Sequence, residues 1–191
     1  MQRALPVLRN AALSLVLLSS SAMADWTLNN EQSALHFVSL KKEHVAEVHT
    51  FKTLSGTVGT DGKASLAIDL ASVNTNVEIR DQRMREMLFD TAKFTTANIT
   101  VDLGADGVKP GIQNIKATLD LHGMKKDIDA TVAVTENGDN LQVATVAPII
   151  INADDFGLAD GINALREAAQ LPSISKAVPV TFVLSFAKQP A

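Results

Sequence analysis

The stretch at residues 71–94 has the sequence ASVNTNVEIRDQRMREMLFDTAKF. It differs from most of the remaining chain, in which apolar and polar residues alternate as they do in short β-strands. At about 100° per residue, Met84, Met87 and Leu88 fall on one helical stripe, and Arg80 lies within that stripe. The spacing therefore predicts a helix, which we expect to pack as a plug across one end of a β-barrel.

The first 24 residues have the features of a secretory signal peptide. Two arginines precede and flank the apolar run 11–18, and an Ala-Met-Ala cleavage site ends at Ala24. The run is too short to span a bilayer, although a membrane anchor is the alternative interpretation. The sequence thus predicts a signal peptide at 1–24, export to the periplasm, and a mature chain, 25–191, without a stable membrane span.

The composition of the mature chain restricts its function. Two of the 17 Lys and Arg residues lie in the signal peptide and all 21 Asp and Glu residues follow it, so the mature net charge is −6. This mild acidity, without a basic cluster, argues against binding of nucleic acid or of anionic lipid surfaces. The chain has no cysteine, so a hydrophobic core must stabilise it, and residues 25–191 suffice for a single domain.

Apolar residues recur at every second position along successive segments of the mature chain. Those that share one face are Ala64, Leu66, Ile68 and Leu70, then Ala97, Ile99, Val101 and Leu103, then Ile115, Ala117, Leu119 and Leu121, then Ile128, Ala130, Val132 and Val134, and finally Val180, Phe182, Leu184 and Phe186. Turn signals such as Asp61-Gly62 separate the segments. This pattern predicts roughly eight antiparallel strands in hairpin order.

We therefore predict an all-β fold with short helical insertions, closed as an antiparallel eight-stranded barrel because closure removes sheet edges. A two-sheet sandwich is the alternative. Residues 45–58 and 141–151 are each predicted to form one extended segment, the first with a bulge or bend at Gly56. A second helix is predicted at 161–170, with Asp160 as its N-cap.

Motifs for nucleotide binding, hydrolysis or zinc proteolysis are absent from the sequence. The histidines are His36, His44, His49 and His122. They lack helical i,i+4 spacing, and His44 and His49 would point to opposite faces of a regular strand, so we expect no metal site. Adjacent Asp154 and Asp155 diverge in an extended chain and are expected to be structural. We predict no catalytic residues; an enzyme remains the alternative if His36, His49 or Asp155 faces the lumen.

Small side chains among the bulky apolar positions favour a cavity. They are Ala64, Ala97, Ala117, Ala130 and Ala133. An eight-stranded barrel is just wide enough either to be packed solid or to hold one slim ligand. Alanine leaves room for a ligand, or for helix side chains that would fill the same space.

Several motifs occur in order along essentially the whole mature chain. They are Ser33-Ala34-Leu35-His36-Phe37, Gly56-Thr57-Val58, Ala71-Ser72-Val73-Asn74-Thr75, Ile79-Arg80-Asp81, Leu88-Phe89-Asp90, Ala117-Thr118-Leu119-Asp120-Leu121-His122-Gly123 and Asp155-Phe156-Gly157. In this order and spacing the chain resembles the YceI-like family of secreted bacterial proteins, also called lipocalin-like polyisoprenoid-binding proteins. Two features depart from the family pattern: Ala153 stands where many members have arginine, and residues 40–51 differ from a commoner shorter, glycine-rich form.

The resemblance implies a lipocalin-like barrel whose lumen holds a long isoprenoid chain, of the polyprenyl phosphate or quinone type, without catalytic residues or a further cofactor. It leaves a homodimer open, since no segment specifies an interface. The alternative is a stress-related structural or interaction protein with a filled core.

The candidate ligand-binding residues are Trp26, Phe37, Phe51, Arg80, Met84, Met87, Leu88, Phe94, Phe156, Phe182, Leu184 and Phe186. Methionines suit a flexible tail because they repack easily. Arg80 is the candidate partner for a phosphate head group, by a bidentate contact. Alternatively it forms an ion pair with Asp81, Asp154 or Asp155.

Overall fold

The computed structural model describes residues 24–104 and 107–189. Its strands are β1 (Ala24–Leu28), β2 (Ala34–Lys41), β3 (Val45–Phe51), β4 (Leu54–Gly59), β5 (Lys63–Asp69), β6 (Val73–Asn74), β7 (Thr96–Asp102), β8 (Gly111–Leu121), β9 (Met124–Asn137), β10 (Asn140–Thr145), β11 (Ile149–Asn152) and β12 (Ala177–Lys188). Its helices are α1 (Glu78–Arg83), the π-helix η3 (Met84–Leu88) that continues α1, and α2 (Ala159–Ala168), with 3₁₀ turns η1 (Asn30–Gln32), η2 (Leu70–Ser72) and η4 (Ala153–Phe156). Residues 1–23 of the predicted signal peptide lie outside this description.

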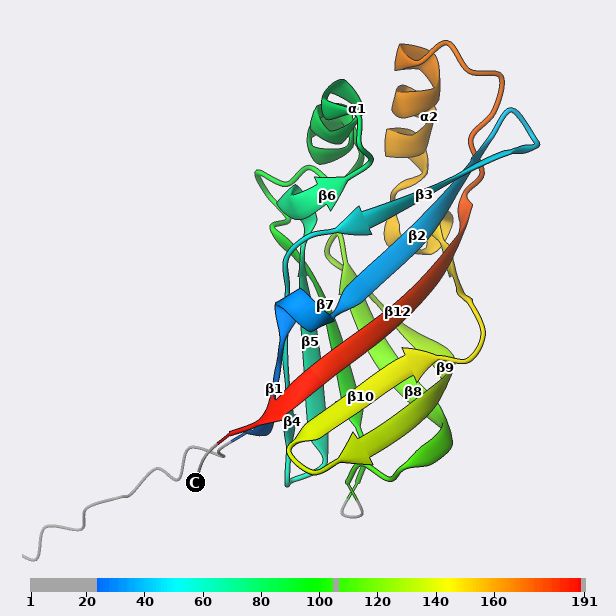
Figure 1. Cartoon of the computed structure of the whole chain (residues 1–191). Coiled ribbons are helices and arrows are strands. Elements are labelled where there is room, and N and C mark those ends of the chain that lie inside the picture. The colour runs from blue at the N-terminus through cyan, green and yellow to red at the C-terminus, as the bar shows by residue number, and fades with distance from the viewer. Residues whose placement is uncertain (1–23, 105–106, 190–191) are drawn as a thin grey trace, which may run out of the picture.

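These strands close into an antiparallel barrel of eight bent strands, which confirms the predicted fold class and excludes the sandwich (Figure 1). The segment pairs β1–β2, β3–β4, β5–β6 and β10–β11 each act as one interrupted strand, because both members of a pair lie against the same neighbours. Strands β7, β8, β9 and β12 complete the ring, and the ladder between β1 and β12 closes it.

Two interruptions differ from the prediction. The chain breaks at 52–53 between β3 and β4, whereas Gly56 pairs regularly with Leu66 and forms no bulge. A Cβ at position 56 would lie 2.5 Å from the carbonyl oxygen of Ser65, so glycine serves close strand approach there. The segment predicted at 141–151 divides into β10 and β11 just before Ile149, where Pro148 has no N–H to donate to a ladder.

Both helices lie at one end of the barrel, beside the tip of the β2–β3 hairpin (Figure 1). The helix predicted within 71–94 begins only at Glu78, because η2 and β6 precede it. α2 begins at Ala159, so Asp160 lies in its first turn and is not the N-cap that we predicted. A Cβ at Gly161 would lie 2.7 Å from the carbonyl oxygen of Met87, which shows that the backbones of α2 and η3 touch.

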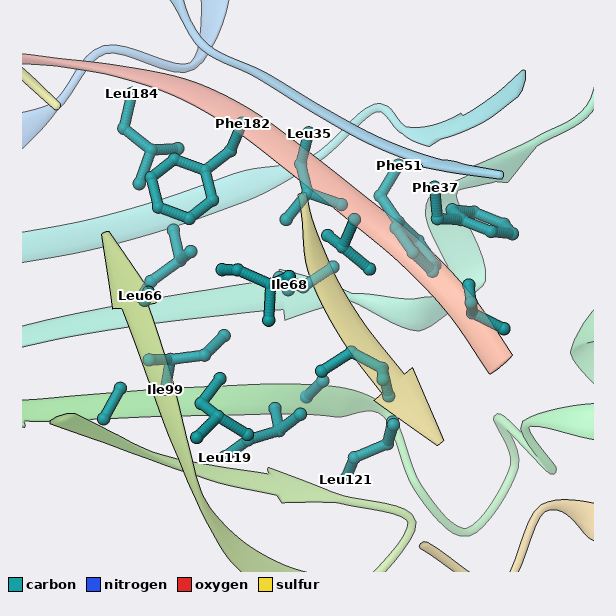
Figure 2. Close-up of a pocket in the computed structure, with 18 of the residues that line it drawn as sticks. Leu35, Phe37, Phe51, Leu66, Ile68, Ile99, Leu119, Leu121, Phe182 and Leu184 are labelled. Carbon is teal, nitrogen blue, oxygen red and sulfur yellow. The ribbon is translucent and has the colours of Figure 1, made fainter. Parts of the chain in front are cut away.

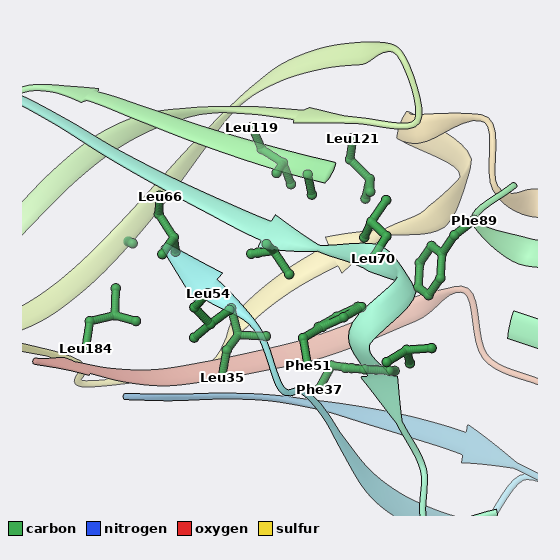
Figure 3. Packing of buried hydrophobic residues seen from close by; sticks show 14 of the residues in the cluster. Leu35, Phe37, Phe51, Leu54, Leu66, Leu70, Phe89, Leu119, Leu121 and Leu184 are labelled. Atoms are coloured by element: carbon green, nitrogen blue, oxygen red, sulfur yellow. The ribbon is translucent and has the colours of Figure 1, made fainter. Parts of the chain in front are cut away.

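The hydrophobic core follows the inward faces of the strands. Figure 3 shows Leu35, Leu66 and Leu119 projecting from different strands toward the same interior. Nearer the helices, the rings of Phe37 and Phe51 have centroids 5.3 Å apart, and Phe89 lies 5.7 Å beyond Phe51. This aromatic row joins the barrel wall to the segment that follows η3.

Candidate functional site

The barrel interior contains a cavity of about 790 Å³. Pockets that bury a small-molecule ligand usually measure roughly 300–1,000 Å³ and are mostly apolar. In Figure 2, Phe182 and Leu184 project from β12 into this space, and Ile99 and Leu119 project into it from β7 and β8. The interior is therefore lined by hydrocarbon from opposite walls and is not filled.

Strand alternation predicted this lining well. All the shared-face residues of the five alternating segments line the cavity. Of the five alanines proposed to leave room, Ala64, Ala97, Ala117 and Ala130 line it, and Ala133 does not. Ala133 occupies the alternate position between Val132 and Val134, both of which face inward. The interpretation of Ala133 as an inward position was therefore wrong.

Eight of the twelve predicted ligand-binding residues line the cavity: Phe37, Phe51, Arg80, Met84, Leu88, Phe182, Leu184 and Phe186. The other four lie elsewhere. Trp26 packs at the edge of the hydrophobic core, Met87 is 38% exposed, and Phe94 packs against His122 with tilted rings at a centroid distance of 4.2 Å. Phe156 is 2% exposed and packs in the core outside the cavity.

The helix-proximal end of the cavity is polar. Glu47 on β3 lines this end. One of its carboxylate oxygens forms ion pairs with both Lys41 Nζ, at 2.6 Å, and Arg80 Nη1, at 2.8 Å. The Lys41 hydrogen bond, assisted by the charge of Arg80, holds the pKa of Glu47 below its ordinary value despite desolvation. Arg80 also donates from Nη2 to the carbonyl oxygen of Thr75 at 2.7 Å.

The ion pair that we predicted for Arg80 therefore has a different partner. Asp81, one of the three candidates, accepts the N–H of Thr75 at 2.8 Å. Asp154 pairs with Lys176 at 2.8 Å. The actual partner, Glu47, lies 33 positions away in sequence, and sheet geometry brings it beside the helix.

His49 adjoins this cluster on the same inward face of β3. It is 3% exposed and lines the cavity, and its Nδ1 is buried without a hydrogen-bond partner among the described residues. Burial, followed by the positive charge of Arg80, lowers the pKa of His49, and Glu47 only partly opposes this. The imidazole is therefore neutral near pH 7 and packs edge-on against Phe37, at a centroid distance of 5.3 Å.

Residues beyond the end of the β7–β8 ladder also line the cavity. The β7–β8 ladder ends at Val101 and Ala117, although β8 continues to pair with β9 as far as Gly111. Inward-facing Ile115 and outward-facing Lys116 both line the cavity.

Residues 26–186 match the family model of the YceI-like domain. The chain belongs to this family. Among solved structures, the YceI-like chain is similar to a polyisoprenoid binding domain from Saccharophagus degradans implicated in plant cell wall breakdown: the two are 40% identical, with a TM-score of 0.83, over 87% of this chain and 100% of that one. Comparison with curated proteins gives no match.

Two further structures share the YceI-like fold at lower identity. Burkholderia cenocepacia BcnA is 19% identical with a TM-score of 0.67, over 83% of this chain and 98% of its own. A Campylobacter jejuni YceI protein is 19% identical with a TM-score of 0.55, over 75% of this chain and 85% of its own. Both support the barrel assignment alone.

The two departures from the commoner YceI-like pattern both lie at the cavity. Ala153 is buried and lines the wall. Residues 40–51 contain Lys41, Glu47 and His49, which we had not named as ligand-binding residues. The signal for Glu47 and His49 was present in the sequence, because these residues and Phe51 recur at every second position and so share a face.

In the part of the chain that the structure describes, no helix is long and apolar enough to cross a membrane. Among these described residues, no three His, Cys, Asp or Glu side chains lie close enough together to hold a metal ion. Of the three titratable groups that would favour an enzyme if they faced the lumen, His49 lines the cavity, whereas Asp155 and His36 lie outside it.

Proposed function

We propose that this YceI-like protein binds a long-chain isoprenoid lipid inside its barrel and stores or transports it in the periplasm. The observation that supports this most directly is an apolar cavity of about 790 Å³ in a chain 40% identical to a polyisoprenoid binding domain. The candidate lipids are polyprenyl phosphates and quinone-type lipids, and no further cofactor is part of the proposal.

Burial of the isoprenoid tail supplies the free energy of binding. Each buried methylene contributes about 0.8 kcal/mol, so one isoprene unit of about five carbons contributes about 4 kcal/mol. Association and ordering cost roughly 4–15 kcal/mol. A tail of several units therefore binds favourably through the apolar wall alone, and Met84 at the helical end can repack around it.

We favour binding over catalysis because the one histidine that lines the cavity has no partner to orient it. A general base is normally held by a hydrogen bond on its second nitrogen. Among the described residues, no hydrogen bond to the imidazole of His49 is formed, and its Nδ1 is buried without a partner. The filled-core alternative is disfavoured by the size of the cavity.

Native mass spectrometry of protein purified from the periplasm of its own host tests this proposal. We expect an adduct with the mass of a prenyl lipid, its loss on solvent extraction, and its return when a prenol is added back. Absence of an adduct, together with no uptake of a prenol by the extracted protein, would refute the proposal. The same spectra report whether a homodimer forms and whether the mature chain begins after Ala24.

A further inference from the structure

Strand β9 is paired unequally along its two edges. The ladder with β8 begins at Met124, the first residue of β9, and is unbroken. The ladder with β10 stops at Val132, and the last link on that edge is the N–H of Val146, which donates to the carbonyl oxygen of Thr131 at 2.9 Å. Within the part of the chain that the structure describes, residues 124–130 therefore have no strand partner on the edge that faces away from β8.

The segment that would continue β10 along this edge turns away from β9. The turn contains Pro148, which has no N–H for a ladder. After it, β11 pairs with β12 from Ile149 to Asn152. Away from their closest approach, the Cα atoms of β9 and β11 lie more than 8 Å apart, whereas hydrogen-bonded strands lie about 4.8 Å apart. The backbone of the barrel wall is thus interrupted between residues 124–130 and β11, and we call this interruption the β9–β11 gap.

A surface pocket of about 300 Å³ lies in the β9–β11 gap, and its lining comes from both strands and from η4. Three of its lining side chains, Ile128, Ile149 and Ile151, also line the barrel cavity. All three are half-buried. The surface pocket and the barrel cavity therefore meet at a layer of isoleucine side chains, with no backbone ladder between them.

Apolar side chains continue across the wall at this point. Ile150 lines the surface pocket but not the barrel cavity, and it is 58% exposed. Its neighbours in sequence, Ile149 and Ile151, line both spaces. The exposed carboxylates of Asp127 and Asp129 flank this path on the β9 side. A hydrocarbon tail that crosses the wall here would keep apolar contact from the outside to the barrel cavity.

Opening the β9–β11 gap requires movement of side chains alone. A tail that crossed a paired part of the wall would break neighbouring ladder hydrogen bonds, and each broken bond leaves a donor and an acceptor unpaired. Rotamer changes of the half-buried isoleucines break no hydrogen bond. Such changes are much faster than the local unfolding that passage through a ladder would need.

We infer that the β9–β11 gap is a side entrance through which the hydrocarbon tail of the lipid passes between the outside and the barrel cavity. This inference rests on the proposed lipid-binding function and concerns the route of the ligand, not its identity. An entrance sets the barrier that uptake and release share. Closing it should therefore slow both by the same factor and leave Kd unchanged.

A cross-link across the gap tests the inference. The chain has no cysteine, so a short bismaleimide reacts with the double variant Asp127→Cys/Ile150→Cys at the introduced thiols. Asp127→Cys/Thr118→Cys is the matched control, because Thr118 and Asp127 face each other in the intact β8–β9 ladder. None of the three residues lines the barrel cavity. Each protein is loaded with tritiated geranylgeraniol, its release into excess phosphatidylcholine vesicles is followed with time, and equilibrium partition measures Kd.

We expect the cross-link across the gap to slow release by at least about 10-fold without a change in Kd, and the control cross-link to leave the rate unchanged. A single substitution tests the inference even if the double variant fails to fold. Asp129→Trp should also slow release, because Asp129 lines the surface pocket but not the barrel cavity. Lys125→Trp is its control, because Lys125 lies on the same outer face of β9 and lines neither space.

Slower release in the cross-linked protein or in Asp129→Trp than in its own control supports the side entrance. Unchanged release in both would overturn the inference and leave the lipid-binding proposal intact, as would equal slowing in each variant and its control. If the unmodified protein takes up no geranylgeraniol, the lipid-binding function is refuted, and the side entrance with it.

Discussion

A bulky substitution in the cavity wall should weaken lipid binding while leaving the stability of the protein nearly unchanged. Ala117 on β8 is 3% exposed and lines the cavity. Ala117→Phe adds about six carbons. If these displace an equal number of lipid carbons at about 0.8 kcal/mol each, binding weakens by about 5 kcal/mol, which corresponds to roughly three to four powers of ten in Kd. In a filled core the same substitution would cost about 1–3 kcal/mol of stability or more, whereas in this cavity we expect a change below about 1 kcal/mol.

Urea denaturation of the lipid-free protein measures the free energy of unfolding, and equilibrium partition of labelled geranylgeraniol measures Kd. Ala133→Phe is the matched control, because Ala133 lies on the same barrel wall in β9 but not in the cavity lining. It should change neither quantity appreciably. A loss of more than about 1 kcal/mol in Ala117→Phe would indicate a filled interior. Unchanged affinity in a stable Ala117→Phe protein would show that the lipid binds elsewhere.

Three further predictions concern stability. Phe156→Ala should lower the free energy of unfolding, measured by urea denaturation, by about 3–5 kcal/mol. Phe182→Ala should lower it clearly less, because one side of Phe182 faces the cavity and makes fewer packing contacts. Equal losses in the two variants would contradict this. Gly161→Ala should destabilise by about 1–3 kcal/mol despite the better helix propensity of alanine, because its Cβ would meet the carbonyl oxygen of Met87 at 2.7 Å; a gain in Tm would show that α2 can shift away. The unfolded chain protonates histidine near pH 6.5 while the pKa of folded His49 is lower, so the free energy of unfolding should fall as pH drops below 6.5, and this slope should shrink in His49→Gln.

The barrel could be predicted because its strands obey a strict period of two. Residues 97–103 alternate without exception and residues 180–186 do so except at the exposed Val183, and each segment turned its apolar face to the lumen. The strand breaks were harder to place. The break at 52–53 contains Lys52 and Thr53, which carry no turn signal. It lies beside the interruptions of the neighbouring strands, where the N–H of Leu54 donates to Asn30 Oδ1 and the N–H of Thr53 donates to Ser72 Oγ.

The polar end of the cavity was only partly predictable. A charge within an apolar stripe identified Arg80 as a residue that needs a partner, but its partner Glu47 depends on how the sheet closes around the helix. Local sequence favoured the nearby carboxylate of Asp81, which instead accepts from the backbone of Thr75. Strand periodicity alone could have identified His49, whereas its missing hydrogen bond is a property of the assembled interior.

The position of β12 has a consequence for synthesis. This strand follows every other barrel strand in chain order, yet it is the one that joins β10 and β11 to β1 and β2. A nascent chain that ends before Ala177 can form its earlier hairpins but has two unpaired strand edges. Such edges can pair with extended segments of other chains. Protection from aggregation during synthesis therefore depends on the strand that is made last, and a chaperone that covers the unpaired edges would be most valuable just before this strand emerges.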